Sequence, residues 1–155
     1  MADYEIAGKR ILELGCGMAL SSLILNRRGG DITATDYHPE AESFLRANVL
    51  LNEDNEIPFF RSSWDDGDSE HGQFDLIIGS DVLYERDNIP SLARFIQDHA
   101  RANCEVVVVD PGRKQQGRFN QRMSLYGFTY RQDKPQDSSY LAKPFSGKIL
   151  RYSRK

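Results

Sequence analysis

The chain has 155 residues, of which 39% are hydrophobic and 28% charged, with a formal net charge of −3 at pH 7. This balance is typical of one soluble globular domain, and we expect it to span residues 1–155. No apolar run reaches the roughly 20 residues that cross a bilayer, and the N-terminus lacks the features of a signal peptide. Cys16 and Cys104 have no further Cys or His at metal-ligand spacing. We therefore predict a cytoplasmic protein without a membrane segment, a disulfide framework or a metal site.

The charges are divided unevenly along the chain. Residues 1–110 contain 9 Lys and Arg against 21 Asp and Glu, whereas residues 111–155 contain 11 against 2. The basic C-terminal third either lies against acidic neighbours and solvent, or forms a surface for an acidic protein or a nucleic acid. The charge alone leaves these alternatives open.

Short β-branched runs alternate with longer amphipathic stretches, which indicates a doubly wound α/β sheet. We expect strands over 9–14, 31–36, 57–61, 74–79, 104–109, 128–132 and 148–152, and helices over 19–28, 39–52, 89–101 and 115–125. An acidic loop is expected over 65–70. The last two strands have no helix between them, so the mostly parallel sheet should end in an antiparallel edge. The predicted apolar faces are Leu20, Leu23 and Ile24 in the first helix, and Ala41, Phe44, Leu45 and Leu51 in the second.

Gly15-Cys16-Gly17 follows the first predicted strand and opens the first helix. Glycines at such a turn let the backbone approach a ligand closely. The dinucleotide fingerprint requires a third small residue three places after the second glycine, and that position holds Leu20. The loop therefore favours a cofactor without phosphates over a nicotinamide dinucleotide.

Three further features lie where strands are expected to end, which is where α/β sheets bind ligands. Asp36 closes the second strand 19 residues after Gly17, a placement in which a carboxylate binds ribose hydroxyls or caps the next helix. Trp64 follows the third strand and offers an aromatic face for an adenine ring or for the core. Asp81 and Tyr84 follow the fourth strand, where they can meet a cationic ligand or serve as a cap and a packing residue.

Together these segments resemble a known enzyme class. Glu13–Gly17, Thr35–Asp36 and Phe74–Tyr84 are similar, in this order, to the three main motifs of class I, seven-stranded S-adenosylmethionine-dependent methyltransferases. The ending Asp81-Val82-Leu83-Tyr84 resembles the protein-lysine methyltransferase-like branch, methyltransferase family 16. The same branch is matched by Asn48, Asn52 and Trp64. The resemblance implies a Rossmann-like methyltransferase fold, S-adenosyl-L-methionine as cofactor and a protein lysine amine as acceptor.

The resemblance also implies roles for individual residues. The cofactor's methionine and ribose would be lined by Glu13, Gly15, Cys16 and Gly17. Its ribose hydroxyls and adenine would be bound by Asp36, Tyr37, Ser63 and Trp64. Its methionine end would lie near Ser80 and Asp81. Asp81 and Tyr84 would shape the entry channel of the substrate nitrogen, and they are the predicted catalytic residues.

The chain departs from the family pattern before the first motif. Relatives usually have an upstream segment that covers the cofactor, whereas only about ten residues precede the motif here. We expect either a truncated chain or a pocket completed by a partner, including a second copy of this chain. Two alternative functions stay open: a nucleic-acid or small-molecule methyltransferase on the same fold, and a non-catalytic cofactor-binding module. Arg113, after the fifth strand, is expected to be solvated or to reach an acidic substrate.

Overall fold

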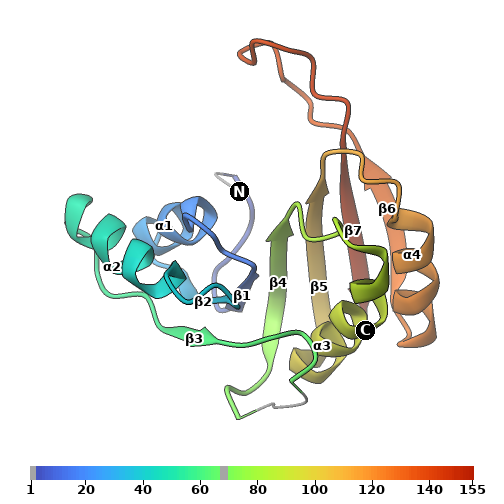
Figure 1. Ribbon diagram of the computed structural model, residues 1–155, viewed down its shortest axis with the longest axis horizontal. Helices are drawn as coiled ribbons and strands as arrows, with labels where there is room; N and C mark the ends of the chain where they lie inside the picture. The colour runs from blue at the N-terminus through green and yellow to red at the C-terminus, as the bar shows by residue number, and fades with distance from the viewer. Residues whose placement is uncertain (1–2, 67–69) are drawn as a thin grey trace.

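The computed structural model describes residues 3–66 and 70–155, which fold around one β-sheet with helices on both faces (Figure 1). The strands are β1 (Arg10–Leu14), β2 (Asp31–Asp36), β3 (Phe59–Arg61), β4 (Phe74–Ser80), β5 (Ala100–Asp110), β6 (Thr129–Asp133) and β7 (Lys148–Arg154). The helices are α1 (Leu20–Arg27), α2 (Ala41–Leu51), the short 3-10 helix η1 (Arg86–Asn88), α3 (Ile89–His99) and α4 (Gln116–Leu125). In the described part of the chain, no helix is long and apolar enough to cross a membrane.

The strand order across the sheet is β3-β2-β1-β4-β5-β7-β6. The first five strands of this order are parallel, and β7 runs antiparallel to both of its neighbours, β5 and β6. The predicted doubly wound sheet with an antiparallel C-terminal edge is therefore confirmed. The chain starts at β1, moves outward to β3 and returns to β4 on the other side of β1. This places the topological switch point between β1 and β4, where sheets of this kind bind their ligands.

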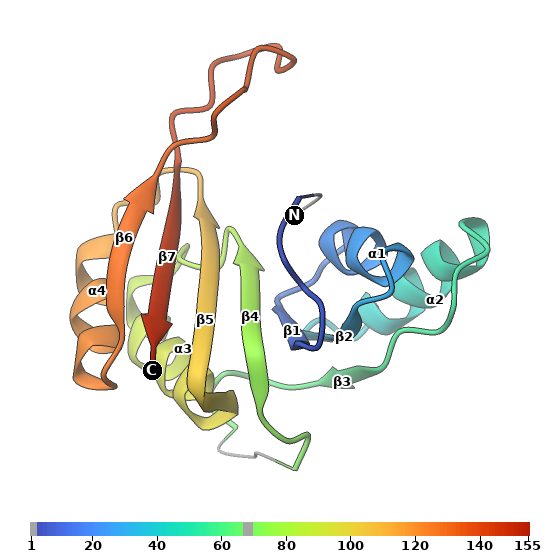
Figure 2. The same cartoon turned by 180° about the vertical axis from the view of Figure 1, so that it is seen from behind.

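Two hydrophobic clusters fill the two faces of the sheet. Alternate residues of a strand point to opposite faces, so Leu12 joins the cluster that contains Phe95 of α3 and Phe119 of α4. Its neighbour Ile11 joins the cluster that contains Leu25 of α1 and Leu45 and Val49 of α2. α3 and α4 lie in front of the sheet in Figure 1 and behind it in Figure 2. Both faces of the central strands are thus buried, which explains their continuous apolar sequences.

The buried face of α1 differs from the predicted one. Leu20 and Ile24, two of the three residues expected on its apolar face, are exposed, whereas Ser22 and Leu25 are buried. Ser22 faces the sheet because its backbone N–H and its hydroxyl both donate hydrogen bonds to the buried carboxyl group of Glu13. A buried acid needs hydrogen-bond donors, and this requirement outweighs the apolar preference of the position.

The predicted apolar stripe of α2 is also partly wrong. Phe44 and Leu51 are exposed, and the buried residues are Ala41, Leu45 and Val49. These three residues are separated by four positions, the spacing that keeps side chains on one side of a helix. The spacing of apolar residues along α2 does not by itself show which side of the helix meets the sheet.

Element boundaries shift by a few residues from the predicted ones. α3 ends at His99, and β5 already begins at Ala100 rather than at Cys104. β3 is shorter than expected and begins at Phe59. The predicted acidic loop lies only partly within the described residues, because 67–69 fall outside them. These shifts do not change which loops lie at the carboxyl ends of the strands.

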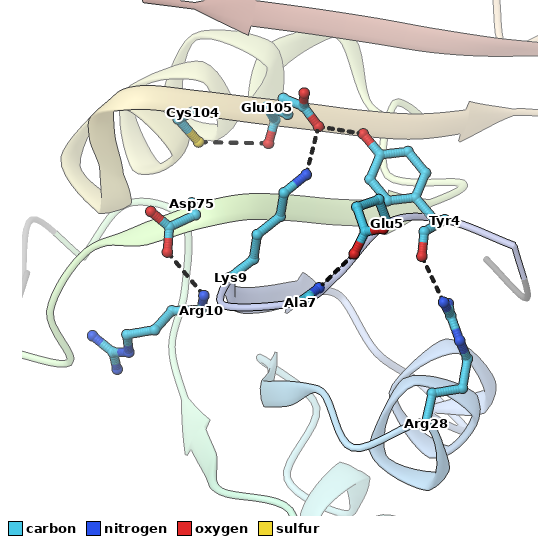
Figure 3. A network of polar contacts seen from close by, with 9 residues as sticks. All are labelled: Tyr4, Glu5, Ala7, Lys9, Arg10, Arg28, Asp75, Cys104 and Glu105. Atoms are coloured by element: carbon cyan, nitrogen blue, oxygen red, sulfur yellow. Dashed lines mark hydrogen bonds and ion pairs between the residues drawn. The ribbon is translucent and has the colours of Figure 1, made fainter.

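The residues before β1 are attached to the sheet by polar contacts (Figure 3). The hydroxyl of Tyr4 donates a hydrogen bond of 2.5 Å to Glu105 of β5, and Lys9 forms an ion pair of 3.3 Å with the same carboxylate. Arg28, just after α1, donates a hydrogen bond of 2.6 Å to the backbone carbonyl of Tyr4. These contacts join the first residues of the chain to β5 and to the end of α1, and so hold β1 in place.

Residues 134–147 connect β6 to β7 and project beyond the carboxyl ends of β4 and β5 (Figures 1 and 2). The base of this connection lies against the turn that follows β5. At Gly147, a Cβ atom would lie 2.2 Å from the carbonyl oxygen of Asp110 and 2.8 Å from Cα of Pro111. Only glycine allows this close approach, which brings the connection to the sheet edge where the parallel strands end.

Candidate functional site

A pocket of about 540 Å³ opens at the carboxyl ends of β1, β2, β3 and β4. Its wall is made by the loop after β1, the end of β2 and the segments that follow β3 and β4. The lining residues are Gly15, Thr35, Asp36, Tyr37, Ser62, Ser63, Trp64, Asp65, Ser80, Asp81, Val82, Tyr84, Glu85, Asn88 and Ser91. The pocket therefore lies at the switch point that the topology defines.

The glycine loop is attached to the end of β2. Gly15 and Gly17 have φ angles of 55° and 52°, in the left-handed region that glycine adopts without strain. The N–H of Cys16 donates to the carbonyl of Thr35 at 2.9 Å, and the N–H of Gly17 donates to the carboxylate of Asp36 at 2.9 Å. The loop thus turns sharply from β1 into α1 while Gly15 presents bare backbone to the pocket.

Glu13 lies behind the pocket rather than in its wall. Its side chain is buried against α1, where Ser22 supplies two hydrogen-bond donors. The pKa of Glu13 is raised from 4.5 to about 7, mainly by burial and to a smaller extent by the charge of Asp36, while the Ser22 donors act in the opposite direction. Its role in the structure is to join β1 to the first helix beneath the glycine loop.

Asp36 stands at the end of β2 with its carboxylate at the pocket. One of its oxygens accepts the N–H of Gly17 and the other accepts the N–H of His38, each at 2.9 Å. A carboxylate has about four acceptor positions, so each oxygen can still accept a further hydrogen bond. Tyr37 follows and is exposed, with the guanidinium of Arg61 5.2 Å from its ring centroid. The end of β2 thus combines a fixed carboxylate with an accessible aromatic ring.

Trp64 forms an aromatic side of the pocket together with Tyr84. The indole is half-buried and packs against the cluster that contains α3, and its ring centroid lies 6.2 Å from that of Tyr84. The turn that carries Trp64 is held by the carboxylate of Asp66, which accepts the N–H of Ser63 at 2.9 Å. The segments after β3 and β4, although distant in sequence, therefore meet through these two rings.

Asp81 is held by its backbone and paired through its side chain. Its φ angle is 54°, and its N–H donates to the carbonyl of Val109 at 2.8 Å. Its two carboxylate oxygens accept hydrogen bonds from Nε and Nη2 of Arg113 at 2.8 and 2.6 Å. Arg113, expected to be solvated or to reach an acidic substrate, is exposed and also pairs with Asp81, and its guanidinium holds the pKa of Asp81 below its ordinary value.

The pocket has a strongly acidic lining. Four carboxylates contribute to it, and the lining residues that the structure describes include no Lys or Arg. The four are Asp36, Asp65, Asp81 and Glu85. Like charges in a partly enclosed site produce a negative potential that attracts cations. Partial burial raises the pKa of Tyr84, and neighbouring carboxylates raise it further, so its phenol stays protonated at neutral pH.

The structure brings together most of the residues that the sequence predicted for the site. Gly15, Asp36, Tyr37, Ser63, Trp64, Ser80, Asp81 and Tyr84 line the pocket. Glu13, Cys16 and Gly17 are not among the lining residues: Glu13 and Cys16 are buried, and Gly17 is exposed and joined to Asp36 through its N–H.

Sequence reasoning missed several lining residues. Some of them are neighbours of predicted residues: Thr35, Ser62, Asp65 and Val82. Others lie between Tyr84 and the first turn of α3: Glu85, Asn88 and Ser91. The helix η1 folds this second group back to the sheet edge, and the side-chain amide of Asn88 donates to Glu85 at 2.6 Å. A group of polar residues between a motif and the next helix was the signal available for them.

The strand order of the sheet and the pocket at its switch point are those of a Rossmann-like methyltransferase fold. Among solved structures, that of magnesium protoporphyrin IX methyltransferase from Synechocystis PCC 6803 with bound SAM is similar, with a TM-score of 0.75 at 18% identity. The similarity covers 99% of this chain and 74% of that chain. At this level of identity, the comparison establishes the shared fold.

The sequence comparison identifies the family within this fold. The sequence profile of the lysine methyltransferase family matches residues 1–125, so the chain belongs to this family. It is 30% identical over 115 residues to protein N-lysine methyltransferase METTL21A of Danio rerio. This alignment covers 70% of this chain and 52% of that protein. It is also 30% identical over 123 residues to electron transfer flavoprotein beta subunit lysine methyltransferase of Mus musculus, covering 78% and 48% respectively. The chain thus spans about half the length of these relatives.

Proposed function

We propose that this chain is an S-adenosylmethionine-dependent methyltransferase that transfers a methyl group to a lysine amine of a protein. The observation that carries the proposal is the acidic, aromatic pocket at the switch point of a chain from the lysine methyltransferase family. A sulfonium cofactor and a lysine ammonium group are both cations, so the acidic lining attracts both. The relatives from Danio rerio and Mus musculus carry the names of protein lysine methyltransferases, which supports the same acceptor.

The residues of the pocket fit this cofactor. The carboxylate of Asp36 retains acceptor positions for the two hydroxyls of a ribose. The buried hydroxyl of Thr35 has no hydrogen-bond partner among the described residues, so the same end of the pocket has a polar atom available for a ligand. Trp64 and Tyr37 offer ring faces to an adenine, and Gly15 leaves its side of the pocket open. When bound, the cofactor supplies an electrophilic methyl group.

The chain would contribute to the reaction mainly by placing the amine. Positioning supplies most of the acceleration when a transfer needs no covalent intermediate. A lysine amine has an ordinary pKa of about 10.4 and must lose its proton before it attacks. Contact with the rings of Trp64 and Tyr84 would remove part of the water around the amine and favour its neutral form, because burial disfavours the charged form, whereas the nearby carboxylates favour the ammonium. The protonated phenol of Tyr84 offers an oxygen lone pair to an amine N–H, and Asp81 orients the arriving ammonium.

Two measurements test this function. Calorimetry should detect binding of S-adenosylmethionine, and transfer of its labelled methyl group into lysate should give protease-sensitive label that hydrolysis recovers as methyl-lysine. Label released by nuclease would indicate a nucleic-acid methyltransferase instead, and binding without any transfer would indicate a non-catalytic module. Asp81→Asn and Tyr84→Phe should transfer the methyl group more slowly than the wild type even when S-adenosylmethionine saturates each variant. Unchanged rates in both variants would refute the roles proposed for these residues.

We also place the protein in the cytoplasm. Both cysteines are free and buried, which fits a reducing compartment. Burial raises the pKa of Cys16 and of Cys104 to about 12, so neither thiol is poised for redox chemistry. Fluorescence microscopy of the tagged protein tests the location, and a signal confined to a membrane-enclosed oxidising compartment would contradict it.

A further inference from the structure

We propose that Arg113 blocks the carboxylate of Asp81 while no substrate is bound. Acidic residues on either side of the substrate lysine would then pair with Arg113 and free Asp81 for the lysine ammonium group. The inference deepens the proposed function and rests on it. Its basis is the bidentate contact in which Nε and Nη2 of Arg113 donate to the two oxygens of Asp81 at 2.8 and 2.6 Å. Asp81 lines the pocket, so the guanidinium stands beside the place assigned to the substrate ammonium group.

The two partners are held differently. The backbone of Asp81 is fixed, because its N–H donates to the carbonyl of Val109 in the adjacent strand. Arg113 comes from the turn after β5, and its side chain is 49% exposed. Its flexible stem lets the guanidinium turn toward solvent while Asp81 stays in place. A carboxylate on a docked protein can therefore reach Arg113 from outside the pocket.

Asp81 cannot serve a guanidinium and an ammonium group equally well at the same time. Admission of the acceptor lysine costs the bidentate, charge-assisted contact with Arg113. An acidic residue beside the lysine replaces this contact with an equivalent one on the substrate. The exchange leaves each cation with one carboxylate and each carboxylate with one cation. A lysine with neutral neighbours offers no such replacement and should bind more weakly.

The charge around Arg113 favours the same partner. Residues 111–155 contain 11 basic side chains and 2 acidic ones, of which Arg154 and Lys155 lie at the far end of β7, away from Arg113. Lys114 is exposed directly after Arg113, and Lys148 lies opposite Asp110 at the start of β7. The connection 134–147, which adds Lys134 and Lys143, rises from the same edge of the sheet (Figure 1). An acidic protein surface around the acceptor lysine thus meets a basic rim, while the lysine itself enters an acidic pocket.

The test compares two pools of nine-residue peptides with a central lysine. The pools differ only in that the flanking positions hold mixed Asp and Glu in one and mixed Asn and Gln in the other. Affinity is measured by fluorescence anisotropy for the full chain with S-adenosylhomocysteine present. We expect the wild type to bind the acidic pool about three- to tenfold more tightly, the range for losing or keeping an accessible charge pair. The preference should decrease in 0.5 M salt, because salt screens exposed charges.

Arg113→Gln and Arg118→Gln separate the specific contact from general charge. Both substitutions remove one positive charge at an exposed position. Arg113 pairs with Asp81, whereas Arg118 belongs to α4. Arg113→Gln should abolish the preference and bind the amide pool more tightly than the wild type does, because Asp81 is then free. Arg118→Gln should keep the preference. A purely structural role of Arg113 would not produce the gain for the amide pool.

Several outcomes would overturn the inference: equal affinities of the wild type for the two pools, no binding of either pool at millimolar concentration, or a preference that survives Arg113→Gln. Tighter binding of a lysine-free oligonucleotide that depends on Arg113 would also overturn it and assign the basic rim to nucleic acid. Calorimetry with S-adenosylmethionine on the same preparations keeps the two levels apart. If the wild type does not bind the cofactor, the proposed function fails; if it binds the cofactor but shows no preference, only this inference fails.

Discussion

The buried carboxyl group of Glu13 makes the stability of this protein depend on pH in a way that one substitution can remove. Burial raises the pKa of Glu13 from 4.5 to about 7 in the folded chain, despite the two hydrogen bonds from Ser22. Well below pH 4.5 the group is protonated in both the folded and the unfolded state, so its ionisation does not change the free energy of unfolding. As the pH rises toward 7 the unfolded state ionises first, so the stability contributed by the protonated group is lost.

The magnitude follows from the difference between the two pKa values. One pKa unit corresponds to about 1.36 kcal/mol, so this carboxyl group should lower the free energy of unfolding by about 3 kcal/mol between pH 4.5 and pH 8. Glu13→Gln cannot ionise and does not incur this loss. The free energy of unfolding of the variant, minus that of the wild type, should therefore increase by about 3 kcal/mol over the same range.

Urea unfolding followed by circular dichroism, without cofactor and at half-unit pH intervals, measures this difference. Glu56→Gln is the matched control, because it makes the same chemical change at an exposed position. A constant difference between Glu13→Gln and the wild type from pH 4.5 to pH 8 would refute the reasoning. So would an increase of the same size in Glu56→Gln, since it would show an effect of net charge rather than of burial.

Three further results are expected. Leu45→Ala should lower the free energy of unfolding by about 2–5 kcal/mol, as truncation of a fully buried leucine does. Leu51→Ala, at an exposed position, should change it by no more than about 0.5 kcal/mol. Similar losses for the two variants in urea unfolding would contradict the assigned buried face of α2. Asp36→Ala should weaken the binding of S-adenosylmethionine about tenfold to hundredfold in calorimetry, because two charge-assisted hydrogen bonds to the ribose are removed. Unchanged affinity would refute the ribose contact. Cys16 and Cys104 should resist a thiol reagent at pH 8 in the folded protein and react within minutes in guanidinium chloride, because both are buried; rapid labelling without denaturant would contradict their burial.

Much of the candidate site was predictable because its residues follow strands directly. The carboxyl ends of parallel strands meet at one edge of a sheet, so a motif that follows such a strand is brought to this edge whatever the details of packing. Asp36 after β2 and Asp81 after β4 illustrate this: both were expected at the site, and both line the pocket. Glu85 and Ser91 were missed because the polar residues after the motif do not by themselves show how the turn at η1 folds them back to the sheet edge.

The sequence by itself determined the order of strands and helices along the chain and the mostly parallel sheet with its antiparallel C-terminal strands. It also determined that the motifs gather at the carboxyl ends of the parallel strands. These features depend on local periodicity and on glycine positions, which act over a few residues. The tertiary structure alone decided that Ser22 turns toward Glu13 and that Arg113 pairs with Asp81 across 32 positions of the chain. Such pairings form between segments that meet only after folding, because buried or closely spaced charges are stable only with a partner nearby. The sequence pattern does not show which segment supplies that partner.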